Sequence, residues 1–560
     1  MRVGFGTRAL ALTTVGAFAV ASCGGGGGTT GGTTPASPDK QILRVNVDTE
    51  PGTLDPVQQQ WVYEANVGRS MYEALLRPKG DLSDVEPAAA ASYSISSDGL
   101  TWTFKLRSDG KFSDGSPVTA SDFVLSYKRI FDPTLAASYE PYFEQIAGTS
   151  TYSSIDAKNP TAVKAYLDGI GVSAPDASTF QIKITSPAPW FKWVVSLWLA
   201  APIKKADVDA VGSANFGAVT AESAAKMHGN GPFVISEVVP KDHITMTPNK
   251  QYRKQPILQK VSFYYITDGN VEFAKFQNGE IDITRGVPSP DVPVVLADPK
   301  LSQQILRGPT LLNWWIDFNT TKAPLNNANV RLALAKSIDR DSYIKNIRKG
   351  IGTPMTSFIP KGERGYELSD IQKFDCTAAK ALIAKAKTEG VTDAQLNGLH
   401  YEYSASSARK PGSEFLQQQW QTCLGINVTV DAVESQTHSR NLHSQNYSIG
   451  GISGWQADYP DGQDWFSIFF TGGGNNFPGW SNKQYEELAH KGDNAPVQAD
   501  RDAAYSAAQK LLEQEAPVMF LYQDEKFLLI SSKVKGWTRT ALDDDWVGDV
   551  ATMLTMYIAA

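Results

Sequence analysis

The chain has 560 residues, of which 42% are hydrophobic and 10% aromatic, a globular composition in a chain too long for one compact core. Its 59 acidic residues outnumber its 52 basic ones, which argues against nucleic acid or an anionic membrane face as partner. Six histidines, with no HExxH motif and no His/Cys cluster, give no support for a metal site, and no cofactor is expected.

The first residues have the pattern of an export signal. Arg2 and Arg8 form a short positive region, and the apolar stretch that follows is too short to span a bilayer. Cys23 comes directly after two small residues, as in the bacterial lipobox, whose cysteine is lipidated. We therefore predict a lipoprotein signal peptide over 1–22 and lipidation at Cys23. An ordinary signal peptide with a chance cysteine is the alternative.

A tether follows the signal. Residues 23–40 are rich in Gly, Thr, Ser and Pro, a composition that buries no core and is typical of a flexible linker. We expect the folded body to begin near Lys40 and to be held at a membrane surface by lipid alone. Without the leader the body becomes more acidic, because Arg2 and Arg8 are removed.

Strand-like and helix-like segments alternate through the body, which predicts an α/β architecture with mixed sheets and no obvious linker. The predicted strands are 42–47, 101–106, 180–184, 233–238, 261–266, 426–430 and 526–530. The predicted helices are 63–76, 120–130, 330–337, 378–387, 413–423 and 501–513.

Two cysteines remain after the leader, Cys376 and Cys423. An exported protein meets an oxidising compartment, so a disulfide is one interpretation. Two separate buried thiols are the other, because spacing alone does not fix the geometry.

The run 454–461 places Asp458 between Trp455 and Tyr459. A carboxylate in an aromatic surrounding suits a cationic ligand group. From the residues alone, a turn acid, or a calcium ligand with Asp461 and Asp464 nearby, is the favoured interpretation of Asp458.

Eight motifs occur in order and resemble those of the extracytoplasmic solute-binding receptors of peptide ABC importers, the oligopeptide- and dipeptide-binding type. The resemblance covers residues 41–560. The motifs are EPGTLDP at 50–56, SDGLTWTF at 97–104, KFSDGSPV at 111–118, NGPF at 230–233, NGEID at 278–282, NTTKAPL at 319–325, VRLAL at 330–334 and IDR at 338–340.

The resemblance implies a two-lobed periplasmic-binding-protein-like α/β fold, type II and cluster C, with a smaller additional α/β domain and a ligand cleft between the lobes. It implies lobe I from 41–72, 185–267 and 520–560, the small domain from 73–184, and lobe II from 268–519.

The resemblance also implies roles at the ligand cleft. Asp458 matches the aspartate that pairs with the α-ammonium group of a peptide. The backbone groups of Gly454 and Gln456, opposed by Trp61 and Val62 from the other lobe, would pair with the ligand main chain as an added strand does. Glycine at 454 would permit close backbone approach, and we list Trp455 as a wall of the pocket.

Other candidate positions follow from the same family pattern. Tyr139 and Tyr142 match a Tyr-x-x-Tyr pair near the ligand side chains, and Asn475 and Asn476 are candidates for the same cavity. For these four a surface or core position is an equal alternative.

The chain departs from the family pattern where the ligand carboxylate is bound. An arginine of the enteric-type receptor is Ile452 here, and a second basic position is His443. Arg409 or Lys410 remains as the candidate for the carboxylate.

Function is expected to be binding, not catalysis. The expected protein is a monomer that captures short peptides and delivers them to the permease and ATPase subunits of an importer. A sugar or metal chelate is the alternative ligand, because relatives differ in cargo. A hydrolase using Asp458 with Asp461 or Asp464 is a further alternative, although Gly-x-Ser-x-Gly and Walker A motifs are absent from the sequence.

Overall fold

The structure is a computed structural model, and it describes residues 34–288, 290–406, 409–542 and 550–560. The predicted signal peptide and Cys23 lie outside the described residues. Among the helices of the described chain, none is long and apolar enough to cross a membrane.

The folded body begins at Pro35, ahead of the predicted Lys40. Pro35 forms a bridge with Ala559, and the Ala36 amide donates to the Ile558 carbonyl at 2.8 Å. The last residues of the predicted tether therefore pair with the C-terminal strand instead of forming a linker.

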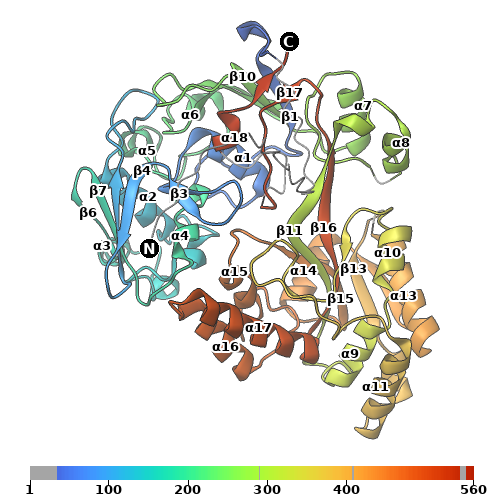
Figure 1. Cartoon of the computed structure of the whole chain (residues 1–560). Helices are drawn as coiled ribbons and strands as arrows, with labels where there is room; N and C mark the ends of the chain where they lie inside the picture. The colour runs from blue at the N-terminus through green and yellow to red at the C-terminus, as the bar shows by residue number, and fades with distance from the viewer. Residues whose placement is uncertain (1–33, 289, 407–408, 543–549) are drawn as a thin grey trace, which may run out of the picture. The chain divides into compact units, whose positions relative to one another are not determined.

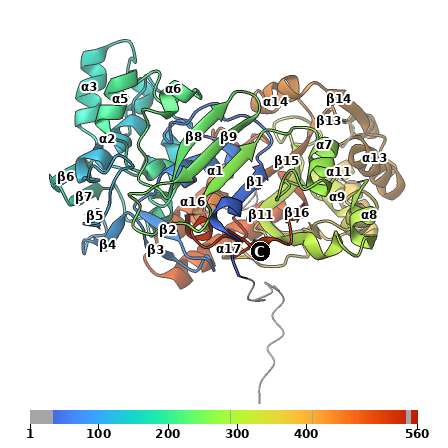
Figure 2. The same ribbon diagram turned by 90° about the horizontal axis from the view of Figure 1, so that it is seen from above.

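The first sheet has four strands in the order β1-β10-β9-β8. β1 runs parallel to β10, and the other neighbours are antiparallel. Figure 2 shows β8 and β9 beside β1 and α1. The strands are β1 (Ile42–Asn46), β8 (Phe233–Val239), β9 (His243–Pro248) and β10 (Lys260–Tyr264), and α1 is Val62–Met71.

The second sheet is antiparallel, in the order β4-β5-β7-β6. In β5 the alternate residues Trp102, Phe104 and Leu106 are buried while Lys105 is exposed, as the period of a half-buried strand requires. The strands are β4 (Ala90–Ile95), β5 (Thr101–Leu106), β6 (Val172–Asp176) and β7 (Thr179–Lys183).

The third sheet has six strands in the order β12-β16-β11-β15-β13-β14. β13 is parallel to both β14 and β15, whereas β11, β12, β15 and β16 pair antiparallel. The strands are β11 (Ile305–Phe318), β12 (Thr353–Pro354), β13 (His400–Ser404), β14 (Thr429–Val433), β15 (Ile449–Gln456) and β16 (Val518–Leu529).

Helices cover both faces of this sheet, as Figure 1 shows. Successive residues of β11 point to opposite faces, so Trp315 joins the core beneath one helix group and Ile316 the core beneath the other. One group is α9 (Ala328–Lys336), α11 (Cys376–Thr388) and α13 (Lys410–Leu424). The other is α15 (Gly462–Phe466), α16 (Lys483–Asn494) and α17 (Gln498–Glu515).

The long pair β11 and β16 connects the third sheet to the first. Leu306 of β11 and Leu528 of β16 lie in the same hydrophobic cluster as Leu43 of β1. Ile530 bridges to Ile283, which in turn bridges to Val45. The two strands thus pass continuously from one core to the other.

The remaining elements are short or lie at the periphery. Two hairpin-like pairs are β2 (Leu76–Pro78) with β3 (Val85–Pro87) and β17 (Val534–Lys535) with β18 (Tyr557–Ile558). The further helices are α2 (Ala120–Ile130), α3 (Pro160–Asp168), α4 (Phe191–Val194), α5 (Lys205–Val211), α6 (Ala221–Ala224), α7 (Gly269–Gln277), α8 (Val292–Ala297), α10 (Arg340–Asn346), α12 (Asp393–Asn397), α14 (Ser435–His443) and α18 (Val550–Met553).

Several predicted elements differ from those observed. Helix α1 ends at Met71, not at residue 76, and the strand predicted at 426–430 lies at Thr429–Val433. The predicted domain boundaries stay a prediction, but the one between residues 519 and 520 falls inside β16, so it cuts a strand of the six-stranded sheet.

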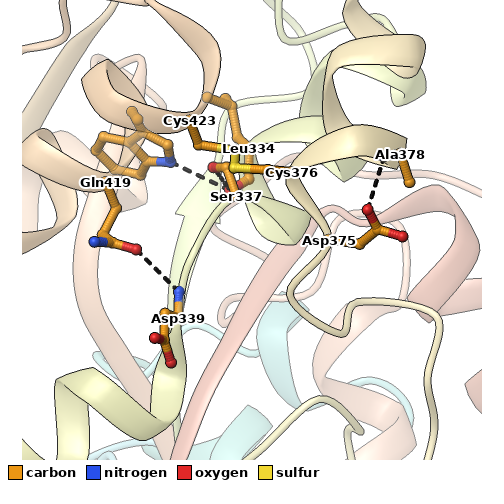
Figure 3. Close-up of a disulfide and its surroundings, with 9 residues drawn as sticks. Leu334, Ser337, Asp339, Asp375, Cys376, Ala378, Gln419 and Cys423 are labelled. Carbon is orange, nitrogen blue, oxygen red and sulfur yellow. Dashed lines mark hydrogen bonds between the residues drawn. A yellow bond between two sulfur atoms is a disulfide. The ribbon is translucent and has the colours of Figure 1, made fainter.

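Cys376 and Cys423 are joined by a disulfide, with 5.6 Å between their Cα atoms. Cys376 is the first residue of α11, which Asp375 caps by accepting from the Ala378 amide at 2.9 Å. Cys423 lies in the last turn of α13. Figure 3 shows the bond beside Leu334 and Ser337, at the C-terminal end of α9. The bond joins α11 and α13 over one face of the six-stranded sheet, which is called the central sheet below.

Removing this disulfide is expected to lower the free energy of unfolding by about 2–4 kcal/mol. The bond closes a loop over a sequence separation of 47 residues, and a loop of this length restricts the unfolded chain substantially. Urea unfolding of Cys376→Ser/Cys423→Ser against the parent protein measures the change. Equal midpoints and slopes would show that the bond contributes nothing to stability.

Candidate functional site

Asp458 follows the end of β15 and accepts two hydrogen bonds from tyrosines far away in the sequence. The Tyr139 hydroxyl donates to Oδ1 at 2.8 Å, and the Tyr142 hydroxyl donates to Oδ2 at 2.5 Å. Tyr142 lies in the 3₁₀ turn at Glu140–Phe143 and Tyr139 directly precedes it, so the two residues, three apart, lie on the same side. Their rings stack with centroids 5.0 Å apart, so the turn presents two phenols to one carboxylate.

Burial sets the electrostatics of this group. It raises the pKa of Asp458, while the hydrogen bonds from Tyr142 and Tyr139 and the charge of Arg69 oppose the rise. Burial and the charge of Asp458 hold the pKa of each tyrosine well above its usual value. The phenols therefore remain protonated and donate to the carboxyl group between them.

Two further acids follow Asp458, one as the cap of α15 and one in its first turn, and both hold the shape of the loop before them. The Asp464 carboxylate accepts from Trp455 Nε1 at 3.1 Å and from the Asp458 amide at 3.0 Å. Asp461 accepts from Arg501 at 2.9 and 2.5 Å and caps α15 through the Gln463 amide. Both carboxylates thus stabilise the segment that follows Asp458.

The calcium and paired-carboxylate interpretations gain no support from this arrangement. Of the three acids, only Asp458 lines the adjoining cavity. Within the part of the chain that the structure describes, no group of three or more His, Cys, Asp or Glu side chains is placed to hold a metal ion.

The strand that leads to Asp458 has an open edge. β11 pairs with β15 as far as Gln456, whereas β13 pairs with the other edge only from Ile449 to Gly451. Among the described strands, none pairs with that edge from Ile452 onwards. The main chain beside the candidate site is therefore placed to pair with an added strand.

Gly454 and Trp455 have structural roles in this strand. A Cβ at Gly454 would come within 2.7 Å of the Asn313 carbonyl and 2.8 Å of the Trp314 ring. The glycine thus permits close packing against β11, and its expected role in ligand approach stays a prediction. Trp455 packs on the core cluster of α15–α17 and is not among the described residues that line the cavity.

For Gln456 the sequence predicted only a main-chain role, whereas the structure also singles out its side chain. Both its side-chain amide oxygen and its nitrogen are buried and have no hydrogen-bond partner among the described residues. An unpaired buried polar group costs about 1–3 kcal/mol, so a polar partner at this position would be stabilising. Gln456 also lines the cavity with Asp458.

Trp61 and Val62 lie where α1 begins. Val62 lines the cavity, and the Trp61 side chain is 54% exposed and stacks on Tyr63. The Trp61 amide donates to the Glu64 carboxylate at 3.1 Å, and its carbonyl accepts from the Glu64 and Ala65 amides. Strand-like pairing through Trp61 would require this helical turn to open.

The cavity beside Asp458 has a volume of about 170 Å³. Its wall comes from α1 and the residues after it, the β2–β3 hairpin, the segment around Trp198, the end of β15 and the C-terminal segment. Trp198 meets Tyr139 edge to face at 4.9 Å, and the Arg69 guanidinium lies 5.2 Å from the Trp198 ring centre. Aromatic side chains thus surround the carboxylate.

Asn475 and Asn476 do not line this cavity. Asn475 is exposed, and Asn476 is buried. The Asn476 amide nitrogen donates to the Trp480 carbonyl at 2.7 Å and its oxygen accepts from the Trp480 amide, so it braces its own glycine-rich loop. The candidate role for Asn476 is therefore replaced by a structural one.

Arg409 also lies apart from the cavity around Asp458. Burial raises the pKa of Tyr343 to about 12, and the charges of Arg348 and Arg409 oppose that rise, which places both cations near this tyrosine. Lys410 pairs with Glu414 on the exposed side of α13. His443 packs edge to face on Phe477, in a separate pocket.

Comparisons with known proteins agree with this architecture. The chain is 29% identical over 500 residues to the oligopeptide-binding protein OppA of Bacillus subtilis, covering 87% of this chain and 88% of that protein. It is 28% identical to the periplasmic murein peptide-binding protein MppA of Escherichia coli, covering 93% and 94%. It is also 27% identical to the probable deoxycholate-binding periplasmic protein YgiS of Escherichia coli, covering 90% and 92%.

Solved structures confirm the fold class. The unliganded open form of MppA superposes with a TM-score of 0.75 and 26% identity, covering 95% of this chain and 99% of that one. OppA of Burkholderia pseudomallei gives a TM-score of 0.75 and 25% identity, covering 93% and 100%. The model of the bacterial extracellular solute-binding proteins, family 5, matches residues 84–477, the larger part of the chain. The chain therefore belongs to the family 5 extracellular solute-binding proteins.

Proposed function

We propose that this protein is a lipid-anchored receptor that captures short peptides and delivers them to an ABC permease. Asp458 binds the α-ammonium group of the peptide. The observation that carries this proposal is a carboxylate, held between two phenols, at the end of a strand with an open edge beside a cavity.

The chemistry of the site suits the common features of peptides. A charge-assisted hydrogen bond between an ammonium group and a carboxylate strengthens where water is excluded. The main chain of Gly454 and Gln456 pairs with the ligand backbone along the open edge, with Val62 in the facing wall. The unpaired amide of Gln456 finds its partner in a ligand peptide group, which offers both a donor and an acceptor.

The other end of the ligand is bound less specifically. Ile452, which stands where the family pattern has an arginine, is partly buried against the core of the central sheet. Arg409, near Arg348 and Tyr343, remains the candidate for the ligand carboxylate. In the complex, the hydroxyls of Tyr139 and Tyr142 either accept from the ammonium group instead of donating to Asp458, or contact the ammonium group together with Asp458.

Delivery follows from closure and tethering. The peptide contacts groups on both sides of the cavity and stabilises the closed receptor by its higher affinity for that state. Lipidation at Cys23 holds the monomeric receptor at the membrane, where the closed form docks on the permease and the ATPase subunits drive release.

Calorimetric titration with a tripeptide and its N-acetylated twin tests this function. The protein is first unfolded and refolded to remove any carried ligand. The free amine is expected to bind and the acetylated peptide to bind at least 30-fold more weakly, because acetylation removes the charge that Asp458 pairs with, at a cost of about 2–5 kcal/mol. Equal binding of both peptides would contradict the role of Asp458.

Binding of neither peptide would contradict the peptide assignment itself. The ligand would then be a sugar, a chelate or another small amphipathic molecule, and the name of YgiS shows that family members of similar sequence are not all described as peptide receptors. Native mass spectrometry of the protein before refolding would then identify the cargo.

A further inference from the structure

We propose that the cavity beside Asp458 selects ligands whose ammonium-bearing residue carries a compact apolar side chain, up to the size of a single aromatic ring. This inference rests on the proposed function, because it takes the ammonium group to be bound at Asp458. The side chain of that residue starts one carbon from the ammonium nitrogen, so it must enter the space that Asp458 borders.

The wall of this space is largely apolar and firmly packed. Ala65 of α1, Leu76 of β2 and Leu197 are at most 3% exposed, and Trp198 is 7% exposed. These residues come from three separate segments that share one hydrophobic cluster. Burial of an apolar group here gains about 0.8 kcal/mol for each methylene removed from water.

Apart from Lys79, the charged residues that share the wall with Asp458 already interact with other parts of the protein, and Arg69 lies over the Trp198 ring. Glu73 is buried and accepts from Arg253 at 2.5 and 2.6 Å and from the Tyr252 hydroxyl at 2.9 Å. Arg77 pairs with Glu86 at 2.7 Å. Lys79 lines the cavity but is exposed, so water already surrounds it. A charged ligand side chain in the cavity would lose water without gaining a buried partner.

The size of the cavity sets the upper limit. Its volume is about 170 Å³, and an apolar protein cavity of about 150 Å³ holds a benzene ring. A leucine or phenylalanine side chain, together with the ammonium group at Asp458, therefore fills the space, whereas the two fused rings of tryptophan leave too little room for that group.

The β2–β3 hairpin fixes this limit from one side. Leu82 at its tip has a φ of 57°, a conformation that few residues other than glycine adopt. The tip packs, together with Leu542, against the core cluster of α15–α17, which lies on the Asp458 side of the cavity. Because the core cluster of α15–α17 supports this wall, we expect the wall to move little when a larger side chain enters the cavity.

A series of tripeptides X-Ala-Ala tests the selectivity by calorimetry on the refolded protein. The peptides with X = Leu or Phe are expected to bind about 10- to 100-fold more tightly than the one with X = Gly, the range that a well-filled apolar pocket provides. The peptides with X = Trp or Glu are expected to bind no more tightly than Gly. Equal affinity for Gly, Leu and Phe, or tightest binding of Trp or Glu, would overturn the inference while peptide binding itself stands.

A cavity-filling variant provides a second test. Ala65→Leu places a larger side chain into the cavity and is expected to abolish the advantage of Phe over Gly. Ala384→Leu, at an exposed position of α11, is the matched control and is expected to keep that advantage. An unchanged preference in a folded Ala65→Leu protein would overturn the inference. Failure of every peptide in the series to bind the parent protein would instead overturn the proposed function.

Discussion

Asp458→Asn is expected to weaken the binding of a free-amine tripeptide by about 2–5 kcal/mol, which is about 30- to 5,000-fold in affinity. Asparagine keeps the size of the side chain and its ability to accept from Tyr139, but it removes the charge that pairs with the ammonium group. The desolvated ammonium group then has no opposite charge at the site. Calorimetric titration of the refolded variant measures the loss.

Asp500→Asn supplies the control for this experiment. Asp500 is an exposed acid in the first turn of α17, so its substitution removes the same charge away from the cavity. Its affinity is expected to equal that of the parent protein. Undiminished affinity in Asp458→Asn, with an unchanged circular dichroism spectrum, would remove Asp458 from the ammonium site.

The same carboxylate predicts a pH dependence. Burial raises the pKa of Asp458, and only its ionised form attracts the ammonium group. Binding of a C-terminally amidated tripeptide should therefore fall as the pH falls through that raised pKa. The decline should begin at a higher pH than the usual aspartate value near 3.9 implies. In Asp458→Asn the affinity should be nearly flat over the same range.

Sequence patterns predicted the elements whose signals are local. The helix predicted at 120–130 coincides with α2, because Thr119 and Asp122 form a capping box ahead of an amphipathic stretch. The strand predicted at 101–106 coincides with β5, in which buried and more exposed residues alternate. In both segments the period and the boundaries can be recognised from neighbouring residues alone.

The central strands were the largest omission. β11 contains Gly308 and Pro309, which interrupt a strand pattern, and its register with β16 shifts after Pro309. Its second half is covered by helices on both faces, so the residues are buried without alternation. Of these two features, only the interruption by Gly308 and Pro309 is visible in the sequence.

The candidate site, too, could be predicted from the sequence only in part. The resemblance pointed to Asp458 and to the Tyr139 and Tyr142 pair, but it gave no reason for them to touch across more than 300 residues. The three-residue spacing of the tyrosines was the available signal, since a 3₁₀ turn places such residues on one side. Gln456 had no such signal, because its unpaired amide is a property of the packed structure.

Arg501→Met is expected to lower the free energy of unfolding by about 3–5 kcal/mol, because it leaves the Asp461 carboxylate buried without its partner. The two side chains are only 3% and 7% exposed. Arg501 also donates to the Gly492 carbonyl at 2.8 Å, so one guanidinium holds the ends of α15, α16 and α17 together. Urea unfolding measures the change.

Two comparisons separate this effect from a general loss of charge. Arg364→Met breaks an exposed pair with Asp502 at 3.4 Å, and it should cost at most about 1 kcal/mol. Arg501→Met/Asp461→Asn should recover part of the stability, because the buried charge is then removed as well. Since Asp461 lies three residues beyond Asp458, Arg501→Met should also weaken peptide binding through the loop. Equal destabilisation by Arg501→Met and Arg364→Met would mean that the buried pair does not anchor this loop.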